Sequence, residues 1–227
     1  MSYIPDHKIQ FKYFTFMAVL SITMMIISML FTYRIIQLGP FTAPGGVFIF
    51  ALTYTVADII TEIYGLKMIR QVILSMLFCI IIFNVVCLLL IQIPVPENAT
   101  YVEEYNLVFS HNINLLIGFS VSFAISDFAN AYAINKWRVL FQGKYFWLRS
   151  IGSSIIGETL FGIFAAALMY TKILSFYDMV KVISSTWLIK VSISILAAYP
   201  ATTLVELLKK VEGIKSIEEL EFKQLYL

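Results

Sequence analysis

The sequence has 227 residues, of which 60% are hydrophobic and 13% are charged, and its mean hydropathy is +0.86. Soluble domains carry about 45–50% apolar and about 25% charged residues, so this composition excludes an ordinary soluble domain and indicates an integral membrane protein. The net charge of +2 is too small to favour a nucleic-acid-binding protein. The lipid bilayer is therefore the expected surrounding of this chain.

Apolar segments, taken in chain order, predict six membrane-spanning helices, because this length accommodates about six spans of roughly 20 residues. Pro and Gly between Gly39 and Gly46 end the first span, since neither residue continues a helix cheaply. A polar loop over 94–112 separates the third span from the fourth. The predicted spans are about 13–38, 47–66, 69–93, 113–135, 148–170 and 182–208.

The expected fold is therefore all-α and integral to the membrane, with one six-helix domain over residues 1–208. Residues 209–227 form a charged tail, which we expect to be a short amphipathic helix or a frayed end. No large soluble domain is left over.

Lysines and arginines predict the orientation of these spans. An even number of spans puts both termini on one side, and that side collects most of the 16 cations, in the stretches 8–12, 67–70, 136–149 and 209–223. The external loop over 94–112 contains acids and no cation. The positive-inside rule therefore predicts that both termini are cytoplasmic.

Five ionisable residues lie inside the predicted spans and away from their ends. A charged residue at the centre of a membrane helix costs about 2.5–3.5 kcal/mol on insertion scales, so it persists where it faces a cavity, a partner or a substrate. The five residues are Asp58, Glu62, Asp127, Glu158 and Lys190.

Four of these charges share one predicted depth. Asp58, Asp127 and Glu158 each lie nine residues from a Lys or Arg at the inner edge of their span. Nine residues correspond to roughly 13–14 Å, near the middle of a hydrocarbon core about 30 Å thick. Lys190 lies nine residues from Lys181 on the opposite edge and reaches a similar plane. We expect these residues to converge near the midplane, where secondary transporters bind their substrates.

Two interpretations of this layer remain open. A buried ion-pair network would only hold the helices together, but three acids against one lysine leave charge unmatched. A site for a polar or cationic ligand resolves the surplus better, and protonation of one acid would resolve it as well.

Glu62 extends the candidate site by one helical turn from Asp58, on the same face by i,i+4 spacing. It is equally suited to pairing with Lys67 or Arg70 at the membrane interface.

Asn130 and Tyr54 complete the candidate set. Asn130 lies near Asp127 in sequence and depth and is the best secondary polar candidate. Tyr54 lies one turn from Asp58 and could supply an aromatic wall or a hydroxyl, although ordinary packing explains it equally well. Small residues between 152 and 162 favour close helix packing, and they could also leave room for a flat ligand.

Two parts of the sequence resemble signatures of the queuosine precursor transporters, six-helix membrane proteins also called the vitamin uptake transporter family. The first is residues 50–65, FALTYTVADIITEIYG, whose D-x-x-x-E-x-Y-G pattern is fairly specific. The second, looser part comprises SD at 126–127, WLRS at 147–150 and SS at 153–154. Order, spacing and helix number agree over about 14–208.

One position departs from this resemblance. Family members usually carry an amide near position 158 and an Asp about three residues later, whereas this chain has Glu158 and Phe161. One helical turn separates the two positions, so Glu158 could supply the carboxylate from a shifted place.

The resemblance implies uptake of a 7-deazaguanine, in its 7-cyano or 7-aminomethyl form, across a bacterial inner membrane. A guanine-like edge presents adjacent N–H donors, which one carboxylate can accept as a bidentate pair. We expect Glu158 or Asp58 at that edge, with Asp127 and Asn130 completing the polar shell. A second acid could hold the ammonium of the aminomethyl form.

Other function classes are less favoured. A membrane enzyme is not expected, because His7 and His111 are the only histidines and both lie outside the spans. The sequence also contains no metal-binding motif, nucleophile elbow or phosphate loop, so we expect no catalytic residue, metal or cofactor. The nearer alternative is a vitamin-binding membrane subunit that depends on a separate ATP-driven module. The oligomeric state stays open.

Overall fold

The fold is described from a computed structural model of the chain, over residues 11–32, 34–39, 41–96, 98–110, 112–170 and 175–214. Both histidines, and residues 215–227 of the predicted tail, lie outside these ranges. The elements are α1 (Phe14–Leu30), β1 (Ile35–Leu38), β2 (Phe41–Pro44), α2 (Val47–Leu90), α3 (Val102–Ser110), α4 (Asn112–Leu140), α5 (Phe146–Ala165), the π-helix η1 (Ala166–Tyr170) and α6 (Phe176–Val211).

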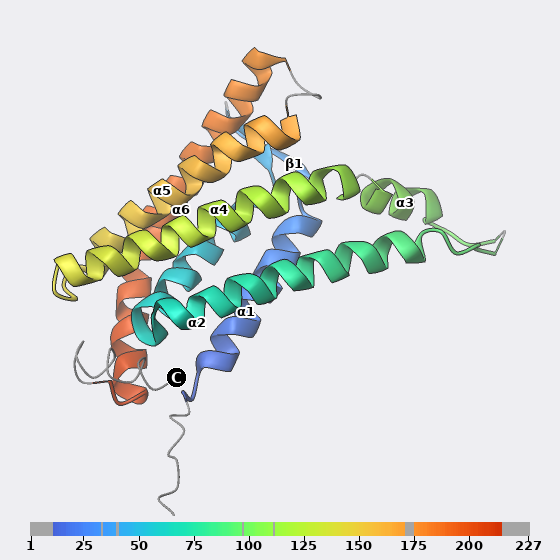
Figure 1. The fold of residues 1–227 in the computed structure, drawn as a ribbon. Coiled ribbons are helices and arrows are strands. Elements are labelled where there is room, and N and C mark those ends of the chain that lie inside the picture. The colour runs from blue at the N-terminus through green and yellow to red at the C-terminus, as the bar shows by residue number, and fades with distance from the viewer. Residues whose placement is uncertain are drawn as a thin grey trace, which may run out of the picture.

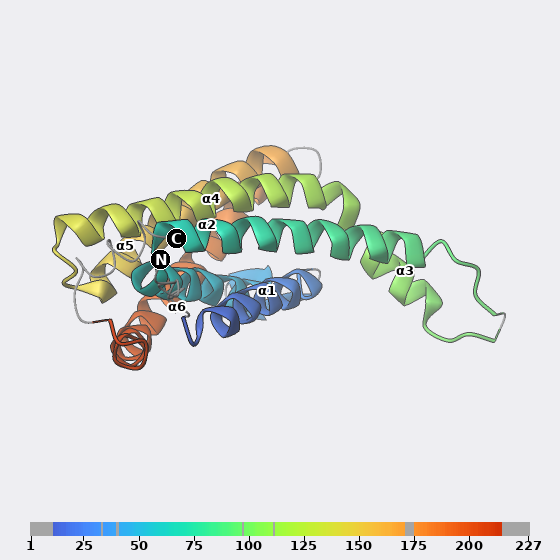
Figure 2. The same ribbon diagram turned by 60° about the horizontal axis from the view of Figure 1, so that its bottom comes forward.

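Long helices build the molecule, which confirms the predicted all-α class (Figure 1). Helix α4 packs against α2 and α5, while α6 packs against α2 and α5. The short helix α3 lies at the opposite end of the molecule from the turn between α4 and α5 (Figure 2).

The first helix is shorter than the predicted span 13–38, because α1 ends at Leu30. The rest of that apolar segment forms the antiparallel hairpin β1–β2, in which Ile35 pairs with Pro44. β-Branched residues suit a strand, and Gly39 adopts the positive φ of 58° that the turn requires. The backbone N–H of Gly45 donates to the carbonyl of Arg34 at 2.7 Å and closes the base of the hairpin.

Helix α2 is divided by a sharp bend at Gly65, whose backbone has φ 84° and ψ 174°. Only glycine adopts this conformation readily, so the residue permits the change of direction seen in Figure 1. The bend deprives carbonyls of the preceding turn of their helical donors. Arg138 of α4 replaces one of them by donating to the carbonyl of Glu62 at 3.2 Å. The position of the bend agrees with the predicted break between spans 47–66 and 69–93.

The remaining helices are longer than the predicted spans. Helix α4 extends past 113–135, α5 with η1 begins before 148–170, and α6 extends past both ends of 182–208. The predicted loop over 94–112 also contains a helix, α3, which begins with two acids in its first turn, a favourable place for negative charge. Single-sequence hydropathy locates the apolar part of a helix and not its polar ends.

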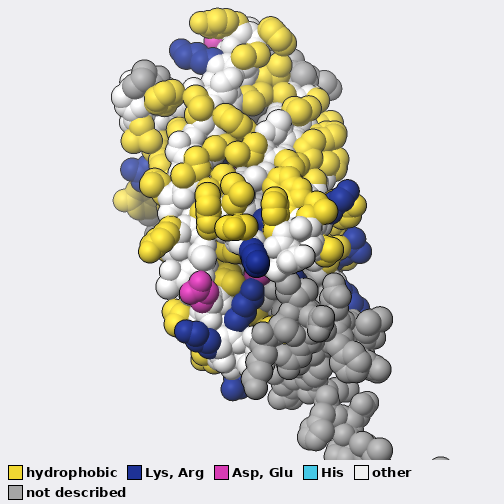
Figure 3. Space-filling view, turned by 90° about the vertical axis from the view of Figure 1, so that its left-hand side faces the viewer, with side chains coloured by type: hydrophobic (Ala, Val, Ile, Leu, Met, Phe, Trp, Pro, Cys, Tyr) yellow, Lys and Arg dark blue, Asp and Glu magenta, His cyan; other side chains and the backbone are white. Residues whose placement is uncertain are grey.

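Within the described part of the chain, four helices are long and apolar enough to cross a membrane: α2, α5 with part of η1, α6 and residues Ile117–Leu140 of α4. Helix α1, with 17 residues, is shorter. Large apolar side chains such as Phe78, Leu196 and Tyr199 are exposed on the helix surfaces. Figure 3 shows hydrophobic side chains over most of one lateral face, with Lys and Arg gathered toward its lower part. This surface is that of a multi-pass membrane protein.

The beginning of α1 and the end of α6 meet at one end of the bundle. Glu212 accepts hydrogen bonds from the backbone N–H groups of Lys12 at 2.9 Å and Tyr13 at 2.8 Å. The hydroxyl of Tyr64, next to the α2 bend, donates to the same carboxylate at 2.9 Å. Glu212 thus satisfies free donors at the start of α1 and joins three helices there.

Candidate functional site

All five charged residues predicted inside the spans are buried, with exposed fractions of 3% or less. Charged groups are fully buried only when a partner compensates them, so the partners of each residue determine its role. Four of the five lie in three environments, which we name the Asp58 network, the Glu158–Lys190 pair and the Glu62 cluster. Asp127 lies outside all three.

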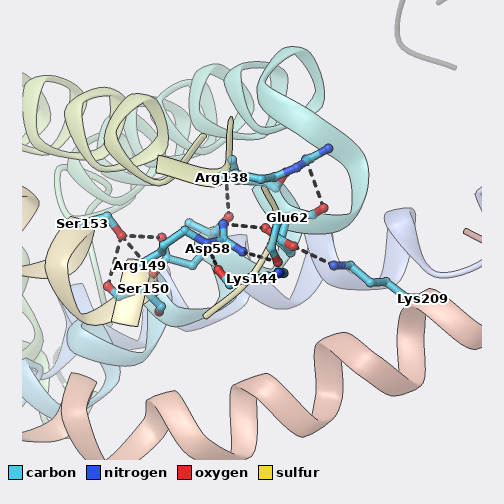
Figure 4. Close-up of polar contacts among 11 residues, drawn as sticks. Asp58, Glu62, Arg138, Lys144, Arg149, Ser150, Ser153 and Lys209 are labelled. Atoms are coloured by element: carbon cyan, nitrogen blue, oxygen red, sulfur yellow. Dashed lines mark hydrogen bonds and ion pairs between the residues drawn. The ribbon is translucent and has the colours of Figure 1, made fainter. Parts of the chain in front are cut away.

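The Asp58 network joins α2 to α4 and α5. Asn130 donates its amide to Asp58 Oδ1 at 2.8 Å, and Ser150 donates its hydroxyl to Oδ2 at 2.6 Å. Ser153 lies 3.4 Å from both oxygens, one turn along α5 (Figure 4). Both oxygens of Asp58 therefore already have donors from the protein. Asn130 was predicted near Asp127 in sequence and depth, whereas in the structure its side chain is hydrogen-bonded to Asp58.

Tyr54 lies one turn from Asp58 and packs between α4 and α5. Its hydroxyl donates to Ser126 Oγ at 2.8 Å, and the side chain is fully buried. A Cβ added to Gly157 would lie 2.7 Å from Tyr54 Cε1 and 3.1 Å from Asn130 Cβ. The absence of a side chain at Gly157 is thus required by this contact, which favours the packing interpretation for the small residues of α5.

The Glu158–Lys190 pair joins α5 to α6. Lys190 Nζ forms an ion pair with Glu158 Oε2, and the other carboxylate oxygen, Oε1, has no hydrogen-bond partner. The ammonium also lies 4.6 Å from the ring centroid of Phe50 and 4.4 Å from that of Phe161, within cation–π range. The rings of Phe50 and Phe161 are themselves in contact, with centroids 4.7 Å apart.

Two small cavities reach this pair. One, of about 30 Å³, lies between α5 and α6 and is lined by Glu158, Phe161 and Lys190. The other, of about 60 Å³, extends from Phe161 and Lys190 toward α1 and the start of α2. Ligand pockets commonly measure about 300–1,000 Å³, so the site is closed to a purine-sized molecule in this conformation.

A wider groove of about 560 Å³ runs along the outer surfaces of α5 and α6. Gly162, Ile183 and Trp187 line both this groove and the cavity beside Glu158. The indole N–H of Trp187 donates to Thr159 Oγ1 at 3.1 Å and so joins the two helices at this wall.

The Glu62 cluster lies next to the Asp58 network and holds α2, α5 and α6 together. Glu62 Oε2 accepts from Arg149 Nη1 at 2.9 Å, and Oε1 accepts from Lys209 Nζ at 2.6 Å (Figure 4). The ion pairs that the structure describes for Glu62 are these two, so pairing with Lys67 or Arg70 was the wrong alternative.

Arg149 is fully buried, although the sequence suggested a cation at the membrane edge. Its Nε also donates to the carbonyl of Lys144 at 2.9 Å. The long side chain thus turns inward to Glu62, a direction that sequence position does not reveal.

Asp127 is buried beside the other acids without a compensating group. Its Oδ2 has no hydrogen-bond partner, and the charges that act on it are those of Asp58 and Glu158. The charges of these three acids all act on Tyr54. The charges of acids from α2, α4 and α5 thus act on Tyr54, and Lys190 of α6 is paired with Glu158.

Sequence reasoning missed several residues of these environments. Ser150 and Ser153 lie at i,i+3 spacing on one face of α5, which was the available signal for their shared partner. Phe161 stood out only as a departure from the resembling family. Phe50 and Arg149 lay within the two signature regions, but nothing in the sequence indicated their contacts. Among the residues that the structure describes, no three His, Cys, Asp or Glu side chains are grouped to hold a metal ion.

A family model described as "Putative vitamin uptake transporter" matches residues 44–205, more than two thirds of the chain. This range contains all seven residues predicted for the site. No curated protein and no solved structure matches the chain.

Proposed function

This chain belongs to the vitamin uptake transporter family, and we propose that it imports a queuosine precursor across a bacterial inner membrane. The proposed substrate is 7-cyano-7-deazaguanine or 7-aminomethyl-7-deazaguanine. The family match supports membrane transport in general, and the deazaguanine follows from the resemblance of the two signature regions.

The proposed topology has six crossings and cytoplasmic termini. Helix α2 has 44 residues, and a straight helix of that length would be about 66 Å long, about twice the hydrocarbon thickness. The bend at Gly65 lets its two halves cross separately. With α1, α4, α5 and α6, this makes six crossings. An even number of crossings puts the start of α1 and the end of α6 on the same side, which agrees with the contact of Glu212 with the start of α1.

The observation that carries the proposal is the Glu158–Lys190 pair with its unpaired carboxylate oxygen. A guanine edge has N–H donors beside a carbonyl acceptor, and an acid next to an ammonium offers the complementary groups. The rings of Phe50 and Phe161 supply flat apolar surfaces against which a fused ring can pack. Glu158 is a better candidate than Asp58, because both oxygens of Asp58 already accept hydrogen bonds.

Substrate entry requires a conformational change, since the cavities at Lys190 measure only about 30 and 60 Å³. We propose that α5 and α6 separate along the groove that ends at Trp187 and Gly162. Movement of helices around a midplane site is the general scheme of secondary transport.

Uptake by the purified protein in liposomes tests the proposal. The wild type should take up labelled deazaguanine. E158Q should need about 10- to 150-fold more substrate for the same uptake, since one hydrogen bond to a charged group contributes about 1.5–3 kcal/mol to binding. E206Q, which neutralises an exposed acid of α6, is the matched control and should behave as wild type.

Three outcomes separate the alternatives. Uptake by the wild type that is weakened in E158Q supports the proposal. Binding without uptake would favour a subunit that needs an ATP-driven module. Absence of deazaguanine binding to a folded wild-type protein would overturn the substrate assignment.

A further inference from the structure

Asp127 is the one acid of the midplane layer that its surroundings leave without compensation. Asp58 accepts hydrogen bonds from Asn130, Ser150 and Ser153, and Glu158 is paired with Lys190. Asp127 is 2% exposed, and within the described part of the chain it has no ion pair and no hydrogen-bond partner at Oδ2.

The charged groups around Asp127 have its own sign. Asp58 on α2 and Glu158 on α5 are the two whose charges act on it, and the hydroxyl of Tyr54 is already donated to Ser126. Lys190 of α6 is engaged by Glu158, and Arg149 by Glu62. Neither of these two cations is therefore available to balance an ionised Asp127, and no ion pair that the structure describes involves it.

A small cation can balance this carboxylate while no substrate is bound. An isolated ionised carboxylate is very costly to bury, whereas a neutral carboxyl group costs far less. A metal ion requires several oxygen ligands, and no group of three acids, Cys or His is placed to hold one among the described residues. A proton needs only one carboxyl oxygen, and Oδ2 is free to take it.

We propose that Asp127 is the proton-binding residue that couples uptake to the proton gradient. This inference rests on the proposed function. A proton from outside binds Oδ2 to give the neutral acid, and the same proton leaves from Oδ2 on the cytoplasmic side, so one proton moves inward with each substrate. The charges of Asp127 and Glu158 act on one another. Substrate binding at Glu158 therefore changes the affinity of Asp127 for a proton, and proton binding changes the affinity for substrate by the same factor.

The test is uptake into proteoliposomes with the membrane potential clamped at zero. For one proton per substrate, an inward gradient of one pH unit should raise internal substrate about tenfold above external in the wild type. D127N, which keeps the shape and removes the titrating group, should exchange labelled for unlabelled substrate but show no accumulation. D127E should restore accumulation with a shifted pH profile, and E206Q should match the wild type.

Each result bears on the inference separately from the proposed function. Tenfold accumulation by D127N, or exchange without any response to the gradient in the wild type, would overturn it. An infrared band of a protonated carboxyl group that disappears in D127N gives a readout independent of substrate. If deazaguanine exchange is absent but this band is present, the substrate assignment fails while proton binding at Asp127 stands. Absence of the band near neutral pH would contradict the inference.

Discussion

Replacement of Glu62 by Gln removes the negative charge that neutralises two cations in the Glu62 cluster. The two cations differ in their access to solvent: the Lys209 side chain is 31% exposed, whereas that of Arg149 is 0% exposed. Lys209 can therefore turn to water, but Arg149 is left as a buried charge without a counter-ion.

The magnitude follows from that difference. An uncompensated buried charge costs about 3–5 kcal/mol. Arg149 keeps its hydrogen bond to the Lys144 carbonyl at 2.9 Å, so the lower end of the range applies. For a chain of this size, about 3 kcal/mol corresponds to a fall in Tm of about 6–12 °C. Thermal unfolding in detergent, followed by tryptophan fluorescence, measures the shift.

Two further variants decide whether the stated cause is correct. E62Q/R149M removes both charges and should unfold at a higher temperature than E62Q alone, because no buried charge is left unpaired. E206Q on the surface of α6 should leave Tm unchanged. An E62Q protein with the Tm of the wild type, or a double variant less stable than E62Q, would refute the reasoning.

Three other predictions concern the bend, the helix contact and the aromatic pair. G65A should lower Tm because the backbone at φ 84° and ψ 174° costs a non-glycine residue about 1–3 kcal/mol, and an unchanged Tm would contradict the bend. G157A should destabilise by about 1–3 kcal/mol in denaturant unfolding, because its Cβ would lie 2.7 Å from Tyr54, and Y54L should recover part of the loss. F161L removes the aromatic face proposed to pack against the fused ring, a contact worth about 0.5–1.5 kcal/mol, and should weaken deazaguanine binding about 2- to 13-fold by equilibrium titration. Equal affinity would exclude the ring from the site.

Local sequence patterns were enough to predict the all-α class and the family, and the predicted spans overlap the long helices. Apolar runs of about 20 residues are a property of consecutive residues, so hydropathy finds them without knowledge of neighbours. Hydropathy predicted the wrong end for the first helix, because the hydrogen bonds of the β-hairpin that follows α1 depend on pairing between two segments. It also missed α3, whose short amphipathic sequence lies in a polar loop.

By itself, the sequence predicted which charges lie inside the spans and a shared depth for Asp58, Asp127 and Glu158, because helical rise converts residue number into distance. Only the tertiary structure decided their partners. In the structure, Asp58 accepts hydrogen bonds from serines of α5, Glu62 forms an ion pair with a buried arginine, and Asp127 has no donor at Oδ2. The reason is that partners come from different helices, and their rotation about the helix axis is set by packing, which residue number does not encode.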